Sequence, residues 1–546
     1  MTDAATLFAQ IAGAYERSDA SAAWLLCDRH DPSAIAYTIV DGDVAHATTY
    51  GQLRSDSLRL ASALRVLGVE PGTRVATLLR KGPELITTML ATWRLGGVYV
   101  PLFTAFAAPA VDFRLRTADA GVVVTDPAQR DKLTPEDAVQ AGGWKIIVVG
   151  GASESGDLSY EDLVAEASED TAPSFIQGPD GDFVHIFTSG TTGSPKGVIH
   201  PLRHAAGWQS YLEHGLGVTH DDVYWCAADP GWAYGLYSAV VSPLAAGVGT
   251  ILQTGSFDPR RAWSLIESLA ITNFTAAPTV YRAIRNTYQT VPSPTRLRRL
   301  SSAGEPLTPE VNEWAERELG LLVHDHFGQT EIGMALANHH HPDLAKPIVP
   351  GSMGYPLPGW SATIIAEDGD QELQIGEVGR VALDVAGSPA MTFESYQDPS
   401  KTASRFAGAG RYYVLGDLGS KDEHGAFHFS ARDDDVIIMA GYRIGPFEVE
   451  SVLSRHPSVA ESAAIAAPDQ ARGEVLEAYV VLRPGTSESP ELAADIQSFV
   501  KKNYAAHAYP RTVHFVSQLP KTPSGKIQRF VLRQQRRDEL STATVR

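Results

Sequence analysis

The segment Ile186–Val198 has the composition of a loop that binds a phosphate group. Hydroxyl residues, glycines and one lysine fall within nine positions: Thr188, Ser189, Gly190, Thr191, Thr192, Gly193 and Lys196. Glycine lets backbone N–H groups approach an anion closely, hydroxyls donate further hydrogen bonds, and lysine adds positive charge. Because Lys196 is followed by glycine, the segment differs from the common nucleotide loop, in which Gly-Lys precedes Ser or Thr. Composition alone leaves an ordinary surface turn as the alternative.

A second candidate for nucleotide chemistry is the carboxylate at the end of Tyr413-Val-Leu-Gly-Asp417. The two oxygens of Asp417 suit the paired 2′ and 3′ hydroxyls of a ribose. An aspartate that caps the turn after Gly416 is the structural alternative. The residue type does not decide between these two interpretations.

The elements that must position these residues alternate between helical and strand patterns. Leu53, Leu60 and Leu64 recur at helical spacing ahead of Gly68, which is well placed to end that helix. Short apolar runs bounded by Gly, Asp or Lys predict buried strands of βα units. These runs are Val75–Leu79, Val122–Thr125 and Ile146–Val149. We therefore predict an α/β fold.

The length of 546 residues exceeds what one hydrophobic core usually supports, so at least two domains are expected. Three consecutive acids in Ser430–Asp435 are poor core material and mark the boundary. We predict domains at 1–433 and 434–546. The second domain is predicted to contain two helices and two strands: Phe447–Ser454, Ala478–Leu482, Leu492–Tyr504 and Thr512–Val516.

The composition excludes several classes of protein. A formal charge of -19 suits neither nucleic acid nor an anionic membrane surface. Two cysteines support no disulfide framework and fit a reducing cytosol. The uncharged stretch Pro230–Phe257 is interrupted by Gly and Pro, so it predicts a buried helix and a short strand near Gly249–Gln253 instead of a membrane span. We expect a cytoplasmic protein without a secretory signal.

The loop at 188–197 closely resembles the signature loop of the adenylate-forming superfamily, which includes acyl-CoA synthetases, adenylation domains of peptide synthetases, and luciferases. Further segments match in the family's order, so the resemblance covers roughly residues 50 to 535. They are Ser302-Ala-Gly-Glu-Pro306, Phe327-Gly-Gln-Thr-Glu331, Tyr413–Asp417, Arg432–Arg443 and Pro520-Lys-Thr-Pro-Ser-Gly-Lys526. The resemblance implies a large N-terminal domain of mixed sheets in several subdomains and a small, mobile α+β C-terminal domain. It also implies an acyl-CoA synthetase that forms acyl-AMP and pyrophosphate, and then acyl-CoA and AMP.

The nucleotide contacts follow from this resemblance. Thr330 would reach the α-phosphate and Glu331 would hold Mg²⁺, which typically takes one or two carboxylates plus phosphate oxygens. The predicted set for ATP and AMP is Thr188, Ser189, Gly190, Thr191, Thr192, Gly193, Lys196, Gly304, Glu305, Pro306, Asp325, His326, Phe327, Gly328, Gln329, Thr330, Asp417, Arg432, Arg443 and Lys526.

The catalytic set is predicted to be Lys526, Glu331 and Thr330. Lys526 stands where the family has its adenylation lysine. Attack of a carboxylate on the α-phosphorus builds negative charge on nonbridging oxygens, and an aimed ammonium stabilises that charge as it develops.

Two half-reactions at one adenylate require two arrangements of the protein, and in the family the small domain rotates between them. The matching hinge position is Asp434. After rotation the loop Ala440-Gly-Tyr-Arg443 would line the pantetheine tunnel, where Gly441 allows close approach. The predicted CoA contacts are Ala440, Gly441, Tyr442, Arg472, Lys501, His507, Ala508 and Tyr509.

The acid is predicted from Asp229-Pro-Gly-Trp-Ala-Tyr-Gly235, which resembles the acyl-pocket segment of acetyl-CoA and medium-chain acyl-CoA synthetases. Acetate-selective relatives carry a Trp where this chain has Gly328, so the glycine is expected to open room for several carbons. Tyr234 replaces a smaller Thr and refills part of that space. The predicted pocket is Trp232, Ala233, Tyr234, Ala303 and Gly328. Roughly C3 to C8, branched or aryl acids are expected over acetate, with a clear chain-length optimum.

Three alternatives stay open. An acetyl-CoA synthetase is one, and a stand-alone adenylation enzyme that loads a carrier protein is another. Residues Trp232–Ser238 contain no acid, which counts against amino acids as substrates but not against aryl acids. A silent nucleotide-binding sensor is the third, and the presence of Lys526, Glu331 and Asp417 argues against it. The sequence does not indicate the oligomeric state.

Overall fold

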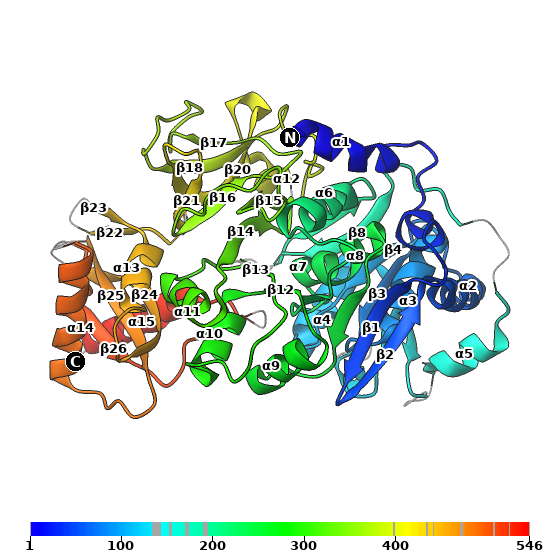
Figure 1. Cartoon of the computed structure of the whole chain (residues 1–546), viewed down its shortest axis with the longest axis horizontal. Helices are drawn as coiled ribbons and strands as arrows, with labels where there is room; N and C mark the ends of the chain where they lie inside the picture. The colour runs from blue at the N-terminus through cyan, green and yellow to red at the C-terminus, as the bar shows by residue number, and fades with distance from the viewer. Residues whose placement is uncertain are drawn as a thin grey trace.

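The computed structural model describes residues 2–133, 143–151, 156–169, 174–188, 195–396, 399–432, 435–439, 442–469, 473–505, 508–522 and 525–544. Within these ranges the strands form three sheets. Helices flank the two sheets of the larger part, and the C-terminal residues form a smaller unit at one end of the molecule (Figure 1). The predicted α/β class is therefore confirmed.

A seven-stranded sheet carries the predicted N-terminal strands, in the order β7-β6-β5-β3-β4-β8-β9. All its pairs are parallel except β8 with β9. Its strands are β3 (Arg74–Leu78), β4 (Val98–Pro101), β5 (Ala120–Thr125), β6 (Lys145–Val148), β7 (Leu158–Ser159), β8 (Asp182–Phe187) and β9 (Gly197–Pro201). The three apolar runs expected to be strands are β3, β5 and β6, within two residues at each end. The antiparallel pair β8–β9 brings both flanks of the 188–197 loop to one edge.

The fourteen-stranded sheet runs in the order β17-β18-β20-β21-β16-β15-β14-β13-β12-β10-β11-β1-β2, with β19 beside β20. Its parallel centre extends from β1 to β14, and antiparallel strands lie on both sides. The strands are β1 (Ile35–Asp41), β2 (Val44–Thr49), β10 (Tyr224–Cys226), β11 (Thr250–Gln253), β12 (Asn273–Ala276), β13 (Arg299–Ala303), β14 (Val323–Gln329), β15 (Gly333–Ala337), β16 (Ser352–Pro356), β17 (Ala362–Ile365), β18 (Gly379–Asp384), β19 (Phe406–Ala407), β20 (Tyr412–Lys421) and β21 (Phe427–Arg432).

Helices cover these sheets with their apolar faces. The predicted helix around Leu53 and Leu64 is α2, which begins at a capping box between Thr49 and Gln52. It ends before Gly68, whose φ of 89° only glycine adopts readily. The α-helices of the larger part are α1 (Ala4–Tyr15), α2 (Tyr50–Val66), α3 (Pro83–Arg94), α4 (Ala108–Ala118), α5 (Tyr160–Glu166), α6 (His204–Ser210), α7 (Ala233–Gly235), α8 (Ser242–Ala246), α9 (Pro259–Ser268), α10 (Pro278–Thr287), α11 (Pro309–Leu319) and α12 (Pro399–Ala403). Shorter 3₁₀ and π turns are η1 (Trp24–Asp28), η2 (Arg130–Leu133), η4 (Tyr211–Gly215), η5 (Leu236–Val241) and η6 (Gly408–Gly410).

The uncharged stretch Pro230–Phe257 folds inside the molecule as α7, η5, α8 and β11. This confirms the expected buried helix followed by a short strand. Across the described ranges, no helix combines the length and the apolar character needed to cross a membrane.

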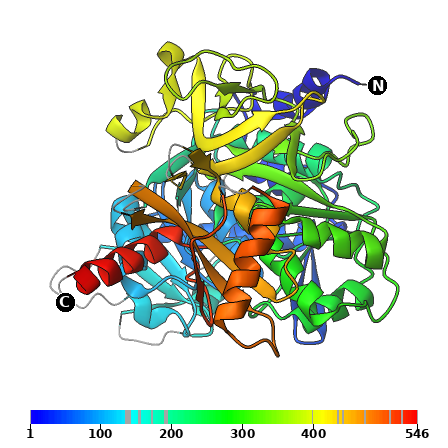
Figure 2. The same cartoon turned by 90° about the vertical axis from the view of Figure 1, so that its left-hand side faces the viewer.

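The C-terminal unit has its own sheet, in the order β23-β22-β25-β24 with β26 beside β25. Helices α13 and α14 pack on one face, while Leu532 of α15 packs on the other (Figure 2). The elements are β22 (Ile437–Met439), β23 (Tyr442–Ile444), α13 (Pro446–Leu453), β24 (Val459–Asp469), β25 (Gly473–Leu482), α14 (Pro490–Asn503), β26 (Thr512–Phe515) and α15 (Arg529–Thr544). The two predicted helices and two predicted strands are all present. The proposed boundary between 433 and 434 lies outside the described residues.

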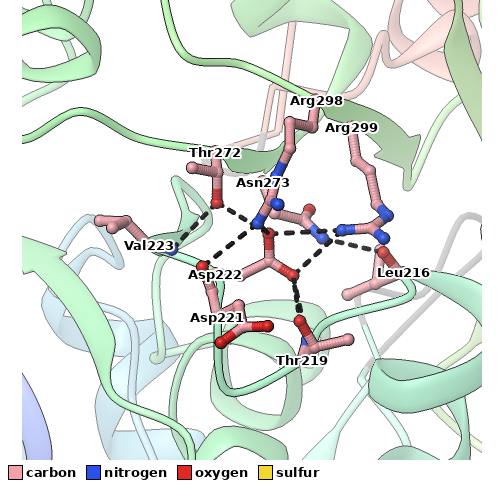
Figure 3. A network of polar contacts seen from close by, with 9 residues as sticks. All are labelled: Leu216, Thr219, Asp221, Asp222, Val223, Thr272, Asn273, Arg298 and Arg299. Atoms are coloured by element: carbon pink, nitrogen blue, oxygen red, sulfur yellow. Dashed lines mark hydrogen bonds and ion pairs between the residues drawn. The ribbon is translucent and has the colours of Figure 1, made fainter.

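A buried carboxylate joins the starts of parallel strands near the middle of the large sheet (Figure 3). Asp222 accepts a hydrogen bond from the Thr272 hydroxyl at 2.7 Å and another from Arg298 at 2.8 Å. It also pairs with Arg299, the first residue of β13, at 3.1 Å. Burial raises the pKa of Asp222, but hydrogen bonds from Thr272, the Thr219 amide and Arg298 outweigh it and lower the pKa below its usual value.

Asp222→Ala is expected to lower the free energy of unfolding by about 2–3 kcal/mol near neutral pH. This is below the ~3–5 kcal/mol typical of breaking a fully buried pair, because Arg298 is half exposed. Since the folded-state pKa is depressed, the stabilisation exists above the unfolded-state pKa and is lost as pH falls through the folded-state value. Denaturant titrations of both proteins from pH 7 into acid should therefore converge. Curves that stay parallel would contradict this role.

Candidate active site

Two connected cavities lie where the C-terminal unit meets the larger part. The larger cavity, of about 700 Å³, receives residues from β14, β20 and β21 and from α13 and α15. The smaller one, of about 180 Å³, lies against α7. Both are lined by Gly304, Gly328–Thr330, Thr522, Lys526 and Gln528. Residues more than 200 positions apart thus share one space.

The larger cavity collects most of the residues predicted to bind the nucleotide. These are Thr188, Lys196, Gly304, Glu305, Pro306, Asp325, His326, Phe327, Gly328, Gln329, Thr330, Glu331, Asp417, Arg432 and Lys526. Ser189–Gly193 lie outside the described residues, as does the side chain of Arg443. The nucleotide contacts themselves remain predictions, but their convergence on one cavity is what such contacts require.

The Asp417 carboxylate is held from two sides at the edge of this cavity. Gln329 Nε2 donates to Asp417 Oδ2 at 2.8 Å, and the Arg432 guanidinium lies 3.4 Å from Oδ1. Asp417 and Arg432 are register partners in the antiparallel β20–β21 pair, so they lie side by side although they are not neighbours in sequence. The side chain is only 3% exposed, so an arriving ribose would meet a carboxylate already fixed in place.

Two further acidic residues, Asp325 and Glu305, line the larger cavity. Burial raises the pKa of Asp325 to about 8, so this side chain is largely protonated at neutral pH and suits an uncharged base better than a phosphate. Glu305 accepts hydrogen bonds from the Thr279 amide at 3.0 Å and from Arg282 at 3.1 Å. His326 lines the same cavity, but both of its ring nitrogens are hydrogen-bonded to protein groups.

Glu331 has a partner that its sequence context does not reveal. The hydroxyl of Tyr396 donates to Glu331 Oε1 at 2.5 Å, and the Lys196 ammonium lies 4.7 Å from the centre of the Tyr396 ring. Glu331 is 6% exposed. One buried, oriented carboxylate beside Thr330 fits an ion that completes its shell with phosphate oxygens. No cluster of three or more His, Cys, Asp or Glu suited to a metal occurs in the described part of the chain.

Lys526 lies between the two cavities, on the segment that precedes α15. Burial lowers the pKa of its ammonium, and the Arg432 guanidinium lowers it further. The carboxylates of Glu305, Asp417 and Glu331 act in the opposite direction. The predicted catalytic lysine is therefore positioned where an acid from one cavity would meet a nucleotide from the other.

The lowered pKa has a consequence for the pH dependence of adenylation. Lys526 must carry its proton to stabilise the developing charge, so kcat/KM should fall as pH rises through a value below that of a solvated lysine. Lys526→Arg keeps a charged group, because a guanidinium does not deprotonate in this range, and its residual activity should lack this alkaline limb. Pyrophosphate release measured across pH in both proteins checks the assignment. An unchanged limb in Lys526→Arg would contradict it.

The smaller cavity contains four of the five residues predicted for the acyl pocket: Trp232, Ala233, Tyr234 and Gly328. Ala303 is fully buried and does not line it. Residues that the sequence analysis missed complete the wall, namely Phe103, Phe106, Arg114, Phe187, Trp208 and Met334. They come from four separate segments, so no local pattern could have indicated them.

The expected effect of Gly328 on pocket size is corrected by the structure. A Cβ at this position would lie 2.3 Å from the Gly333 carbonyl oxygen and 2.6 Å from Met334 Sδ. The bulge between Phe327 and Gly328 brings β15 into this space. The glycine is therefore required for the close approach of β15. Because β15 lies there, the absence of a Trp side chain at position 328 does not by itself leave empty space.

The predicted CoA contacts are placed only in part. Ala440, Gly441, Arg472 and His507 lie outside the described residues, as does the hinge candidate Asp434, and only the backbone of Tyr442 is described. The Lys501 ammonium and the Tyr509 ring lie together, 5.5 Å apart, while Ala508 is buried in the core of the C-terminal unit. Strand β22, which leads to the predicted tunnel loop, lies at the outer side of this unit, and its residues line neither cavity (Figure 1). Lys526 therefore lines both cavities, whereas the described residues of β22 line neither.

Comparison with known proteins agrees with this geometry. A family described as AMP-binding enzyme matches residues 27–392, and its C-terminal domain matches residues 448–526. The acetyl-coenzyme A synthetase of Bacillus subtilis (strain 168) is 37% identical over 525 residues, which cover 94% of this chain and 90% of that protein.

Two solved structures extend the comparison. An acyl-CoA synthetase of Brucella canis is 39% identical with a TM-score of 0.76, covering 99% of this chain and 98% of that one. An anthranilate CoA ligase in complex with anthranoyl-AMP is 27% identical with a TM-score of 0.87, covering 96% of this chain and 99% of that one. The chain therefore belongs to the AMP-binding enzyme family and is an AMP-forming acid–CoA ligase.

Proposed function

We propose that this ligase activates a short- to medium-chain, branched or aryl carboxylic acid in preference to acetate and transfers it to CoA. The smaller cavity carries the proposal. Its volume of about 180 Å³ is close to the ~150 Å³ of an apolar cavity known to hold benzene. Aromatic rings form much of its wall, and none of the described lining residues is acidic. An amino acid would therefore find no partner for its ammonium.

Acetate is the second candidate, because a relative named acetyl-coenzyme A synthetase is similar over most of the chain. Acetate would leave most of the smaller cavity unfilled. A larger acid would gain about 0.8 kcal/mol of binding free energy for each methylene group buried there. A structural neighbour that carries anthranoyl-AMP supports an aryl acid in the same fold. The cavity volume is what favours the larger acids.

The deciding experiment is a panel of acids assayed for pyrophosphate release, with CoA or a carrier protein as acceptor. We expect propionate through octanoate, branched acids and benzoate-sized acids to include the highest kcat/KM, with CoA as the better acceptor. A higher kcat/KM for acetate than for all larger acids would overturn the substrate proposal. Transfer to the carrier protein alone would favour an adenylation enzyme, and no pyrophosphate release with any acid would favour a sensor.

The proposal also includes Mg²⁺ held by Glu331, a cytoplasmic location, and domains at 1–433 and 434–546 joined by a hinge at Asp434. The single oriented carboxylate of Glu331 supports the metal. The separate sheet and core of the C-terminal unit support the division into domains.

Met334→Ala should move the chain-length optimum toward acids about one or two carbons longer. Met334 is 4% exposed and lines the smaller cavity, so its truncation enlarges the space at the end of the acyl chain. Met89→Ala provides the control, because Met89 is fully buried in α3 and lines neither cavity. Both variants should lose stability, but only Met334→Ala should change the order of kcat/KM values. An unchanged optimum would contradict the assigned pocket.

A further inference from the structure

A chain of buried hydrogen bonds leads away from the wall of the smaller cavity. Tyr234, on α7, lines that cavity, and its hydroxyl oxygen lies 2.9 Å from the Tyr211 hydroxyl oxygen. Tyr211 in turn lies 3.0 Å from His326 Nδ1, and His326 Nε2 lies 3.2 Å from the Asn338 carbonyl oxygen. Tyr211 is fully buried and lines neither cavity.

The carbonyl at the far end determines the direction of every bond in this chain. A carbonyl oxygen only accepts, so His326 Nε2 carries the ring proton. Burial lowers the pKa of His326 well below its usual value, which keeps the ring neutral and leaves Nδ1 as an acceptor. Tyr211 therefore donates to His326 Nδ1, and its oxygen can only accept from Tyr234.

The Tyr234 hydroxyl has a second polar partner, the hydroxyl of Thr275. Thr275 Oγ1 lies 3.2 Å from it and 3.2 Å from the Ser301 carbonyl oxygen. That carbonyl also accepts from the Tyr281 hydroxyl at 2.9 Å, and because a carbonyl oxygen can accept two hydrogen bonds, the one Thr275 proton lies between two acceptors, this carbonyl and the Tyr234 hydroxyl oxygen. The Tyr234 hydroxyl thus donates to Tyr211 and has Thr275 as a second partner that it shares with the Ser301 carbonyl, so both contacts are made inside the protein.

We infer that Tyr211 and His326 are specificity-determining residues that act through Tyr234, and that the acid's distal end is apolar where it meets this wall. The inference rests on the proposed acyl pocket and deepens it. Tyr234 presents its ring to the cavity, while its hydroxyl is held away from the substrate. A hydroxyl, amino or carboxylate group at that end of the acid would be desolvated there without a hydrogen-bond partner from Tyr234.

The position of the Tyr234 ring depends on this series of hydrogen bonds, because its hydroxyl cannot move deeper or outward without losing a polar partner. Tyr211→Phe removes the acceptor for Tyr234 and the donor for His326, which frees the ring to shift. The ratio of kcat/KM for the best acid to kcat/KM for the acid one methylene longer should then fall by about fourfold. This factor corresponds to the free energy of burying one methylene group. KM for ATP should change less than this ratio does, because Tyr211 lines neither cavity and His326, which lines the larger one, keeps its bond to the Asn338 carbonyl oxygen.

The test compares Tyr211→Phe with Tyr224→Phe. Tyr224 is also fully buried, and its hydroxyl donates to the Ser238 carbonyl at 2.9 Å. This bond is not part of the series that links Tyr234, Tyr211 and His326. Both variants lose one buried hydroxyl, so a general loss of packing would affect them alike. The expected result is a lowered kcat/KM ratio in Tyr211→Phe and an unchanged ratio in Tyr224→Phe. Equal ratios in the two variants would overturn the inference.

A double-mutant cycle with Tyr234→Phe tests the route of the effect. If Tyr211 acts through the Tyr234 hydroxyl, Tyr234→Phe alone lowers the ratio and Tyr211→Phe adds nothing to it. Additive effects would overturn the inference, as would a preference for a distally hydroxylated or carboxylated acid over its apolar analogue. Failure of the proposed function is distinct, because then the wild-type protein itself would turn over no larger acid better than acetate.

Discussion

Lys526→Ala is expected to lower the rate of acyl-adenylate formation at least about a hundredfold, while thioester formation from supplied acyl-adenylate and CoA is largely retained. The reason is geometric and electrostatic. Lys526 lines both cavities, so in the proposed role its ammonium would meet the charge that develops on the α-phosphate, and a preorganised donor at that point is worth about two to three orders of magnitude. Thioester formation begins after that charge has been resolved.

The two half-reactions are measured separately, the first by pyrophosphate release and the second by thiol consumption. Lys502→Ala is the matched control, because it also removes a lysine from the C-terminal unit but at an exposed position of α14. It should leave both rates within about twofold, as is typical of surface substitutions. Equal loss of both half-reactions in folded Lys526→Ala would refute the assignment.

Glu331→Gln is expected to lower the kcat/KM of adenylation by about a hundredfold or more. A metal ion that bridges phosphate oxygens supplies several kcal/mol of charge stabilisation, and an uncharged amide holds Mg²⁺ poorly. The substitution preserves the size of the side chain, so the hydrogen bond from Tyr396 can be kept. Raising the Mg²⁺ concentration should partly restore this variant, whereas it should do nothing for Lys526→Ala.

Tyr396→Phe separates the metal role of Glu331 from its packing. This variant keeps the carboxylate and loses the 2.5 Å hydrogen bond that orients it. We expect a smaller loss than in Glu331→Gln and a higher Mg²⁺ concentration for half-maximal rate. If Glu331→Gln instead kept a normal rate and a normal Mg²⁺ dependence, Glu331 would not be the metal residue.

Features encoded by neighbouring residues could be predicted from the sequence. The apolar runs that became β3, β5 and β6 carry their own burial signal, and α2 carries both of its end signals. Many residues of the larger cavity could be predicted because each lies in a short motif that resembles one of the adenylate-forming superfamily. Asp417 and Arg432 lie in two such motifs, and the β20–β21 register then explains why they meet.

Contacts between distant segments could not be predicted in the same way. Tyr396 is 65 positions from the carboxylate that it orients, and the bond from Tyr211 to His326 spans 115 positions. Gly328 shows a further limit. Its residue type indicated empty space, but a bulge in the backbone brings another strand into that space. The size of a pocket depends on backbone packing that one residue does not encode.

Thr522, Lys526 and Gln528 contribute to the walls of both cavities, and this has a bearing on the fate of the proposed intermediate. An acyl-adenylate is a mixed anhydride, and free water destroys it. If Lys526 is the catalytic lysine, as we propose, the anhydride would form only while this wall is in place. The residues that promote formation of the reactive compound would then also shelter it from hydrolysis, and the predicted rotation of the C-terminal unit would admit the thiol.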